Sequence, residues 1–332
     1  MAIDPDVQAE LDILTSRLEA VEAEEGVLRH AQFIDADDTA SSIQTKIDAG
    51  PVIFMEDVFV ADPLIVDSPS YIDLNGYKLS SSASAVFRFV AGAWDVFLEN
   101  GELVAQNGHV FDVEYLSNST IQRTTAQTWK ADKSVWRQDD GQAYDVLVQG
   151  GHWKGKAGMT EPIVYISRGH FNTNTFQRLR FTNNASITPP NVPVIYLQKQ
   201  EQNWYYQNVF RDMNFEQPNA GAVHAYGIFG TLFENLGVYD TGPAGLITDH
   251  LWMVDASTTG LKSVDTTFKN VTRVGNGQAV SGIHDIHIEG HYSKSLIVDN
   301  CGGSSGANVA HRIKNNLSAE IRGGNWKTIV TS

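Results

Sequence analysis

Cysteine is almost missing from this sequence, which contains only Cys301. A single thiol excludes any disulfide within the chain and is typical of a protein that folds in a reducing compartment. Long apolar runs are missing too, because no stretch approaches the roughly 18 residues of a membrane-spanning helix. Residues 1–20 lack the basic start and apolar centre of a signal peptide. We therefore expect synthesis in a cytoplasm and exit by a route such as cell lysis, without membrane insertion.

Basic residues are scarce as well: 24 Lys and Arg face 39 Asp and Glu, which gives a net charge of −15. This charge argues against nucleic-acid binding, because phosphates would be repelled. It also argues mildly against binding a strongly anionic glycan without cations. The chain has no phosphate-binding P-loop, no paired Cys-x-x-Cys, no His-Glu-x-x-His and no Gly-x-Ser-x-Gly. We therefore expect no cofactor and no metal site.

What the sequence does contain points to a folded, β-rich protein. Hydrophobic residues make up 42% and charged residues 19%, a balance typical of soluble folded chains. The 28 glycines, with many Asn, Ser and Thr, indicate numerous turns. A length of 332 residues suits an elongated repeat architecture better than one compact core.

Residues 1–30 carry a heptad pattern. Asp4 and Pro5 are suited to the N-cap and first position of a helix, and apolar residues follow at alternating spacings of four and three. Leucine at a with valine at d is not the dimer pattern, so we predict a parallel three-stranded coiled coil and a homotrimer. The alternative is one amphipathic helix lying on its own domain. The expected oligomerisation seam is Val7, Leu11, Leu14, Leu18, Val21 and Leu28.

A short helix is expected next, at about residues 38–49. Asp37 or Asp38 is a suitable N-cap, and Gly50 followed by proline should end the helix. Short strands separated by turn residues then follow. The residues expected on the helix's apolar face are Ala40, Ile43 and Ile47. The expected strands are Val52–Met55, Val58–Val60, Leu64–Val66 and Tyr71–Leu74.

Residues 33–79 resemble the opening of pectate-lyase-like bacteriophage tailspikes. The shared order is an acidic turn, Asp-Thr, a short amphipathic helix, glycine, an apolar strand and a strand similar to IDLNGYKL. The sequence departs from the family in having one glycine, rather than a glycine run, before the strand. The resemblance implies an all-β, right-handed parallel β-helix over residues 31–332, with the helix covering the open end of its first turn.

A repeated triplet supports this fold. From about residue 96 onward, short strands contain an aromatic or aliphatic residue, two residues, an apolar residue, one residue and another apolar residue. Turns of a β-helix stack about 4.8 Å apart and place like residues over like residues. The triplets are Phe176-Leu179-Phe181, Phe210-Met213-Phe215, Phe233-Leu236-Val238 and Ile283-Ile286-Ile288, with a bulged version at Phe268-Val271-Val274.

We therefore predict that Phe176, Phe210 and Phe233 stack inside neighbouring turns, with Arg178 beside Asp212 outside. The alternative folds are a β-sandwich or a β-propeller, which require hairpins. The sequence has few two-residue hairpin turns. The clearest candidates for such turns are Asn75-Gly76 and Asn100-Gly101.

Carboxylates give only weak catalytic candidates. Asp285 and Glu289 share one face of an expected strand but span about 13 Å, whereas paired carboxylates of glycosidases lie about 5–9.5 Å apart. A solvated or intersubunit strand face is the favoured interpretation. Asp139 and Asp140 lie in a loop, where adjacent acids usually decorate a turn. Carboxylates from separate turns of a β-helix would leave no local motif. The lack of a motif therefore does not exclude an enzyme.

Aromatic residues in turn-rich segments suggest glycan binding. Flat rings stack on sugars, while polar neighbours bond to sugar hydroxyls. The alternative is that each ring covers an end of the β-helix or packs between subunits. The candidate glycan-binding residues are Trp129, Trp136, Trp204, Tyr205 and Tyr206.

Together these features favour a virion protein: a bacteriophage tail fibre or tailspike that attaches the particle to a host surface glycan. Its expected partners are two further copies of itself, other tail or capsid proteins through the N-terminal segment, and the host polysaccharide. The alternative is a tailspike that hydrolyses or lyses that polysaccharide. A secreted pectate-lyase-type enzyme is less consistent with the N-terminal heptads.

Overall fold

A computed structural model of the chain describes residues 30–183, 191–198, 205–240, 250–255, 263–273, 284–289, 296–303, 310–314, 319–323 and 328–331. The expected coiled-coil residues, Val7 to Leu28, lie outside these ranges, so the coiled coil and the trimer remain predictions. No helix among the described residues is long and apolar enough to cross a membrane.

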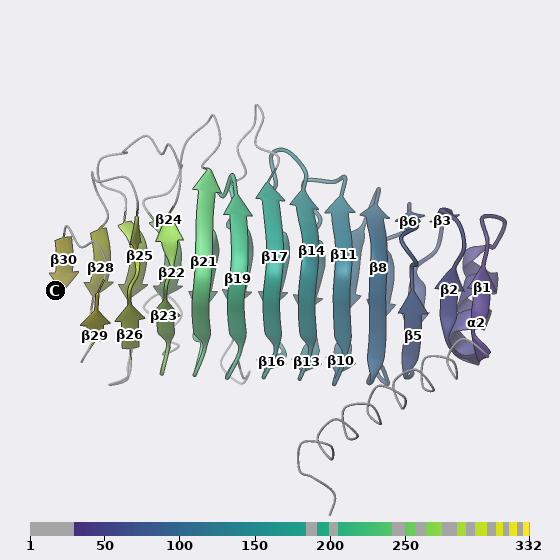
Figure 1. The fold of residues 1–332 in the computed structure, drawn as a ribbon, viewed down its shortest axis with the longest axis horizontal. Helices are drawn as coiled ribbons and strands as arrows, with labels where there is room; N and C mark the ends of the chain where they lie inside the picture. The colour runs from purple at the N-terminus through teal and green to yellow at the C-terminus, as the bar shows by residue number, and fades with distance from the viewer. Residues whose placement is uncertain are drawn as a thin grey trace, which may run out of the picture.

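The chain winds into an elongated parallel β-solenoid whose strands stack along the long axis (Figure 1). Every strand pairing in the described ranges is parallel. Antiparallel hairpins are the basis of sandwiches and propellers, so these folds are excluded and the predicted parallel β-helix is confirmed.

Among the described residues, three sheets form the walls of the solenoid. Sheet A runs through β1 (Gln32–Ile34), β2 (Val52–Phe54), β5 (Ser70–Asp73), β8 (Val96–Ala105), β11 (Thr120–Thr128), β14 (Leu147–Gly155), β17 (Thr175–Asn183), β19 (Val209–Glu216), β21 (Leu232–Asp240), β23 (Thr267–Lys269), β26 (Leu296–Asp299) and β29 (Ala319–Arg322). Joined to it are β3 (Val58–Val60), β6 (Lys78–Ser81), β24 (Thr272–Arg273) and β27 (Gly302–Gly303).

Sheet B contains β4 (Leu64–Val66), β7 (Ala85–Phe89), β9 (His109–Val113), β12 (Trp136–Asp139), β15 (Val164–Ser167), β18 (Ile195–Gln198), β20 (Val223–Tyr226), β22 (His250–Asp255), β25 (His284–Glu289), β28 (Ala310–Lys314) and β30 (Thr328–Thr331). The short sheet C contains β10 (Tyr115–Ser117), β13 (Gln142–Tyr144) and β16 (His170–Asn172).

The expected helix is present as α2 (Ala40–Ala49), which packs on β1, β4 and β5 at one end of the solenoid (Figure 1). Its N-cap is Thr39, whose side chain accepts a hydrogen bond from the backbone of Ser42, so the prediction of Asp37 or Asp38 as N-cap was wrong. Asp38 instead binds Lys46 Nζ at 2.6 Å. As predicted, Gly50 ends the helix, and its apolar face packs inward. The buried residues of that face are Ile43 and Ile47.

A bend inside the long strands of sheet A explains the repeated triplet. Each of these strands contains a residue with positive φ, such as Asn100 (58°) in β8 or Arg178 (55°) in β17, and β14 contains two, Gly150 and Gly151. This left-handed residue interrupts the alternation of a flat strand. Phe176 and Leu179, three residues apart, therefore both point into the core. The column of bend residues is Asn75, Asn100, Arg123, Gly150, Arg178, Asp212, Asn235, Asn270, Asn300 and Gly323.

The predicted inner columns are confirmed. Phe176 pairs with Phe210 and Phe210 with Phe233, with ring centroids 5.6 and 5.3 Å apart. Phe268 continues the column at 4.9 Å from Phe233. The triplet containing Ile286 belongs to sheet B, because Ile286 pairs with Trp252.

Buried amides hold the turns that precede sheet A. Asn174 and Asn208 are almost completely buried. Asn208 Oδ1 accepts hydrogen bonds from the backbone N–H (3.1 Å) and Nδ2 (3.2 Å) of Asn174, and its own Nδ2 donates to Phe171 O at 2.8 Å. Such bonds satisfy polar groups that the solenoid buries away from water.

Candidate functional site

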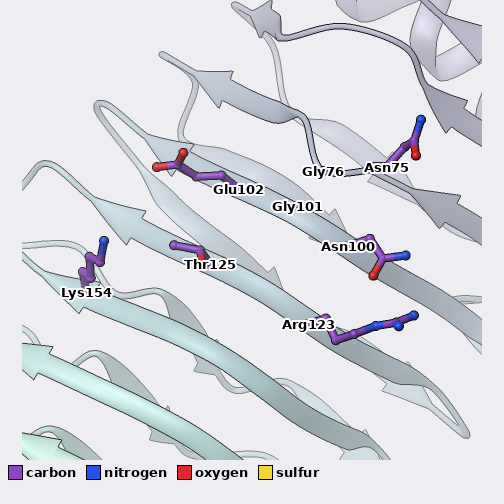
Figure 2. Close-up of a pocket in the computed structure, with 8 residues that line it drawn as sticks. All are labelled: Asn75, Gly76, Asn100, Gly101, Glu102, Arg123, Thr125 and Lys154. Carbon is purple, nitrogen blue, oxygen red and sulfur yellow. The ribbon is translucent and has the colours of Figure 1, made fainter.

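An open pocket of about 530 Å³ lies on the outside of sheet A, along its bend (Figure 2). We call it the bend groove. It crosses four successive turns, from the loop after β5 through β8 and β11 to β14. Its lining residues are Asn75, Gly76, Asn100, Gly101, Glu102, Arg123, Thr125 and Lys154.

The lining of the bend groove is polar and well supplied with hydrogen-bonding groups. Two residues provide amides, Thr125 a hydroxyl, Glu102 a carboxylate, and Arg123 and Lys154 positive charges. The parallel register fixes their spacing, because Glu102 of β8 pairs with Thr125 of β11. Amide, hydroxyl and charged groups of this kind can donate to and accept from a ligand rich in hydroxyls.

Ion pairing differs between the two cations of the groove. Arg123 pairs with Glu99. Burial disfavours ionisation of Glu99, but hydrogen bonds from Gln122, Arg123 and Tyr71 hold its pKa below the usual value. For Lys154, by contrast, no described carboxylate lies within ion-pair distance. Lys154 is therefore the cation of the groove whose charge is not paired within the described residues.

His152 lies beside the groove, paired with Thr125 on the neighbouring strand. Its Nε2 is 2.7 Å from Thr182 Oγ1, which donates to Glu216 at 3.0 Å, so Nε2 is the donor to Thr182. Burial and the charges of Lys154 and Arg180 lower the pKa of His152, while Glu216 opposes them.

Replacing Lys154 with Gln is expected to raise the pKa of His152, because a nearby positive charge that disfavours the imidazolium is lost. Titration of the imidazole resonances by NMR measures this directly. The matched control is Lys130→Gln, which removes an exposed lysine beyond the end of β11. An unchanged His152 pKa in the Lys154 variant would show that the two groups do not interact.

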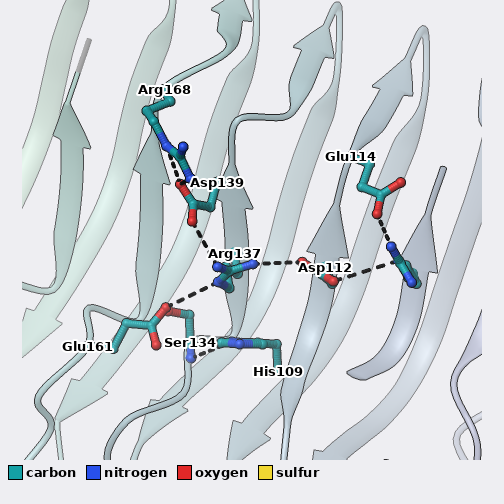
Figure 3. A network of polar contacts seen from close by, with 9 residues as sticks. His109, Asp112, Glu114, Ser134, Arg137, Asp139, Glu161 and Arg168 are labelled. Carbon is teal, nitrogen blue, oxygen red and sulfur yellow. Dashed lines mark hydrogen bonds and ion pairs between the residues drawn. The ribbon is translucent and has the colours of Figure 1, made fainter. Parts of the chain in front are cut away.

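A second polar cluster lies on the outer face of sheet B (Figure 3). Arg137 is at its centre, 3.4 Å from Asp112, 2.9 Å from Asp139 and 3.8 Å from Glu161. Arg168 binds the other oxygen of Asp139 at 2.6 Å. We call these five residues the arginine network.

Burial perturbs two titratable groups in or near this network. Desolvation raises the pKa of Glu161, which favours its protonated form. His109 is buried beneath the network and accepts a hydrogen bond from the backbone N–H of Ser134 at 3.0 Å. Desolvation, with the positive charges of Arg137 and Lys133, lowers the pKa of His109 to about 3. His109 is therefore neutral at physiological pH.

A Glu161→Gln variant tests the burial of this carboxyl. A raised folded-state pKa contributes stability below the unfolded-state pKa, and this stability is lost as the pH rises through the folded-state pKa. As the pH rises from the unfolded-state pKa through the folded-state pKa of Glu161, the wild type should therefore lose stability relative to the variant. Denaturant unfolding at a series of pH values measures this loss. Glu56→Gln, at an exposed position after β2, is measured in parallel to correct for the loss of one carboxylate. Parallel curves for the wild type and Glu161→Gln would contradict the expectation.

The structure places the predicted catalytic carboxylates in different surroundings. Asp139 joins the arginine network, whereas Asp140 is exposed at a turn with φ 67°. Asp285 and Glu289 lie on the expected strand, β25, where the register shifts next to Asp285, but their side chains lie outside the description. No three His, Cys, Asp or Glu side chains among the described residues could together hold a metal ion.

Two of the predicted glycan-binding rings are core residues. Trp136 is fully buried against Phe111 and Phe176. Tyr205 is also buried, and its hydroxyl donates to Arg168 O at 2.7 Å. Neither ring can stack on a sugar, because sheet B and the turn before sheet A place both inside the solenoid.

The other predicted rings have different surroundings. Trp129 is 48% exposed just beyond the end of β11, and Tyr206 is partly buried. Trp204 lies outside the described residues. Of the predicted rings that the structure describes, Trp129 and Tyr206 are the ones that a ligand can reach.

An aromatic strip lies around sheet C, and apart from Tyr206 its residues were not predicted from the sequence. Trp94 and Phe229 are about half exposed, and Tyr144 contacts both Tyr115 (6.4 Å between ring centroids) and His170 (6.3 Å). Most of these rings directly precede a residue with positive φ, such as Asp95 after Trp94. An aromatic residue followed by Asp or Gly, as at Trp94, Tyr144 and Phe229, was the signal that could have revealed half of the strip. We define the aromatic strip as Trp94, Tyr115, Tyr144, His170, Tyr206 and Phe229.

The bend groove had a sequence signal that was misread. Asn75-Gly76 and Asn100-Gly101 were interpreted as possible hairpin turns, but Asn75 and Asn100 occupy the bend of a parallel sheet. The left-handed conformation that Asn tolerates is the same in both settings. Only the pairing of the flanking strands distinguishes them.

Comparisons with known proteins give no further guide to function. No family model matches the chain, and no curated protein or solved structure is significantly similar to it.

Proposed function

We propose that the protein is an attachment fibre of a virus particle and that it binds a host surface glycan in the bend groove. The observation that carries the proposal is the open groove lined by amide, hydroxyl, carboxylate and cationic side chains. A parallel sheet holds these groups at fixed spacings, so a hydroxyl-rich chain can bind with little ordering of the protein.

The aromatic strip supports the same proposal. Its exposed rings, such as Trp94 and Phe229, offer flat apolar surfaces along the solenoid, and Tyr206 is among the residues for which glycan contact was predicted. Homotrimer formation through residues 1–30, which would join the fibre to other virion proteins, is part of the proposal. Three equivalent grooves in each fibre would strengthen a weak glycan affinity through effective concentration.

Blocking the groove tests this function. In Thr125→Trp a bulky ring replaces a partly buried outward side chain of β11 and should fill the groove. We expect the variant to unfold at the wild-type temperature but to lose binding to host cells and to host envelope polysaccharide. The matched control is Thr120→Trp, at an outward position of the same strand beyond the groove.

The readout is adsorption of labelled protein to host cells, together with competition against intact virus particles. Equal adsorption by Thr125→Trp, Thr120→Trp and the wild type would place the binding site elsewhere. Equal virus adsorption with and without excess wild-type protein would contradict the attachment role.

The arginine network favours a second candidate, a polysaccharide depolymerase. Asp139 and Glu161 contact the same guanidinium group, and burial favours the protonated form of Glu161. A protonated acid near a second carboxylate is the arrangement that glycoside hydrolysis requires. In that case Glu161 would protonate the leaving oxygen, and Asp139 would act as nucleophile or base.

Incubation with host polysaccharide distinguishes the two candidates. A depolymerase should release shorter products, and Asp139→Asn and Glu161→Gln should each abolish the release while binding persists. Intact polysaccharide after prolonged incubation with a protein that binds it would exclude the second candidate and leave the first.

A further inference from the structure

Charged side chains are distributed unevenly along the bend groove. Its β14 end carries Lys154, and the adjoining outward positions hold His152 and, one turn further on, Arg180. Towards its other end, on β8, are the amide of Asn100 and the carboxylate of Glu102. The groove is thus cationic at one end and able to accept hydrogen bonds from hydroxyls at the other.

The cationic end is not fully neutralised by the protein. Arg180 forms an ion pair with Glu216 at 2.6 Å. For Lys154, by contrast, no carboxylate among the described residues lies within ion-pair distance. Lys154 and Arg180 both disfavour the protonated form of His152, so both charges act on this side chain. The chain has a net charge of −15, but at Lys154 it presents an unpaired positive charge. An anionic group of a ligand would neutralise that charge.

We infer that the ligand of the bend groove is a glycan with isolated acidic sugars, one of whose anionic groups is bound by Lys154. This inference rests on the proposed function and specifies its substrate class. The neutral part of the glycan extends towards Asn100 and Glu102, whose carboxylate accepts hydrogen bonds from sugar hydroxyls. A polymer with an acid on every sugar would place negative charge against Glu102, so sparse acidic residues fit better.

A glycan array tests this inference. The array holds bacterial oligosaccharides that contain uronic acids, each beside its carboxyl-reduced neutral counterpart, together with phosphate-bearing glycans. The wild type should bind acidic members and discriminate against the reduced counterparts. Lys154→Gln should weaken this binding about ten- to a hundredfold, which corresponds to the loss of one hydrogen bond to a charged group. The matched control is Lys156→Gln, two residues away and exposed, which should bind as the wild type does.

Titration of His152 by NMR adds a readout that does not depend on affinity. Saturation with the tightest-binding uronic-acid oligosaccharide should raise the pKa of His152, because the bound anion offsets the charges of Lys154 and Arg180. The other groups near His152 are Thr182, within hydrogen-bond distance of its Nε2, and Glu216, which accepts a hydrogen bond from Thr182. No shift with bound acidic ligand would place the anion elsewhere and overturn the inference.

The outcomes separate the inference from the proposed function. Equal binding of acidic glycans and their reduced counterparts, with Lys154→Gln unaffected, would overturn the inference and leave glycan binding intact. Phosphate-bearing glycans bound in preference to uronic acids, with loss in Lys154→Gln, would support it and identify the anion as phosphate. A protein that binds no member of the array and no host polysaccharide would overturn both.

Discussion

Replacing Phe210 with Ala is expected to lower the free energy of unfolding by about 3–5 kcal/mol per chain. The ring is fully buried in the centre of the solenoid, between Phe176 at 5.6 Å and Phe233 at 5.3 Å. Neighbouring turns are held by their strand pairs and cannot close fully around the missing ring, so a cavity remains. Denaturant unfolding followed by circular dichroism measures the change.

Phe59→Ala is the control for this prediction, because that ring is 53% exposed on β3. A surface truncation of this kind should change the unfolding free energy by no more than about 0.5 kcal/mol. A similar loss of stability in the two variants would show that Phe210 does not occupy a packed inner column.

Replacing Asn208 with Ala should destabilise the protein by roughly 3 kcal/mol, although little apolar volume is lost. The substitution removes the acceptor of two hydrogen bonds from Asn174 and the donor to Phe171 O. These groups remain buried, and each unsatisfied group costs about 1–3 kcal/mol.

The matched control is Asn107→Ala, which removes an exposed amide in the turn after β8. We expect its unfolding free energy to lie close to that of the wild type. If Asn208→Ala changed the unfolding free energy as little as Asn107→Ala, the prediction would be contradicted. Water would then have replaced the lost partners, and the amide pair would not be needed to hold the turns.

The parallel fold could be predicted from sequence because stacking of like residues leaves a direct trace. Phe176, Phe210 and Phe233 recur in one triplet and occupy one column. The triplet encodes the bend as well, because two residues separate Phe176 from Leu179 where a flat strand would have one. That meaning could not be read without knowing that the intervening Arg178 has positive φ.

The site was less predictable because it depends on which side of a turn each residue faces. Trp136 lies in a turn-rich segment, but Arg137 and Asp139 take the outward positions of the same short strand and leave Trp136 to the core. The bend groove draws its residues from four turns, so Asn75 and Lys154 are far apart in sequence. Only the register of the stacked strands brings them together.

The partners of Asp139 illustrate the same limit. Arg137 is two residues away and could be anticipated, but Arg168 comes from the next turn, as does Glu161, which pairs with Arg137 rather than with Asp139. The raised pKa of Glu161 arises from burial that no local pattern in the sequence records.

A crystal structure of the protein with its tightest-binding host glycan fragment is the most direct test of the proposed function. We predict electron density for the sugar chain in the bend groove, with contacts to Asn100, Glu102 and Arg123 and an anionic group at Lys154. Sugar density on sheet B at the arginine network, with the bend groove empty at saturating ligand, would contradict it.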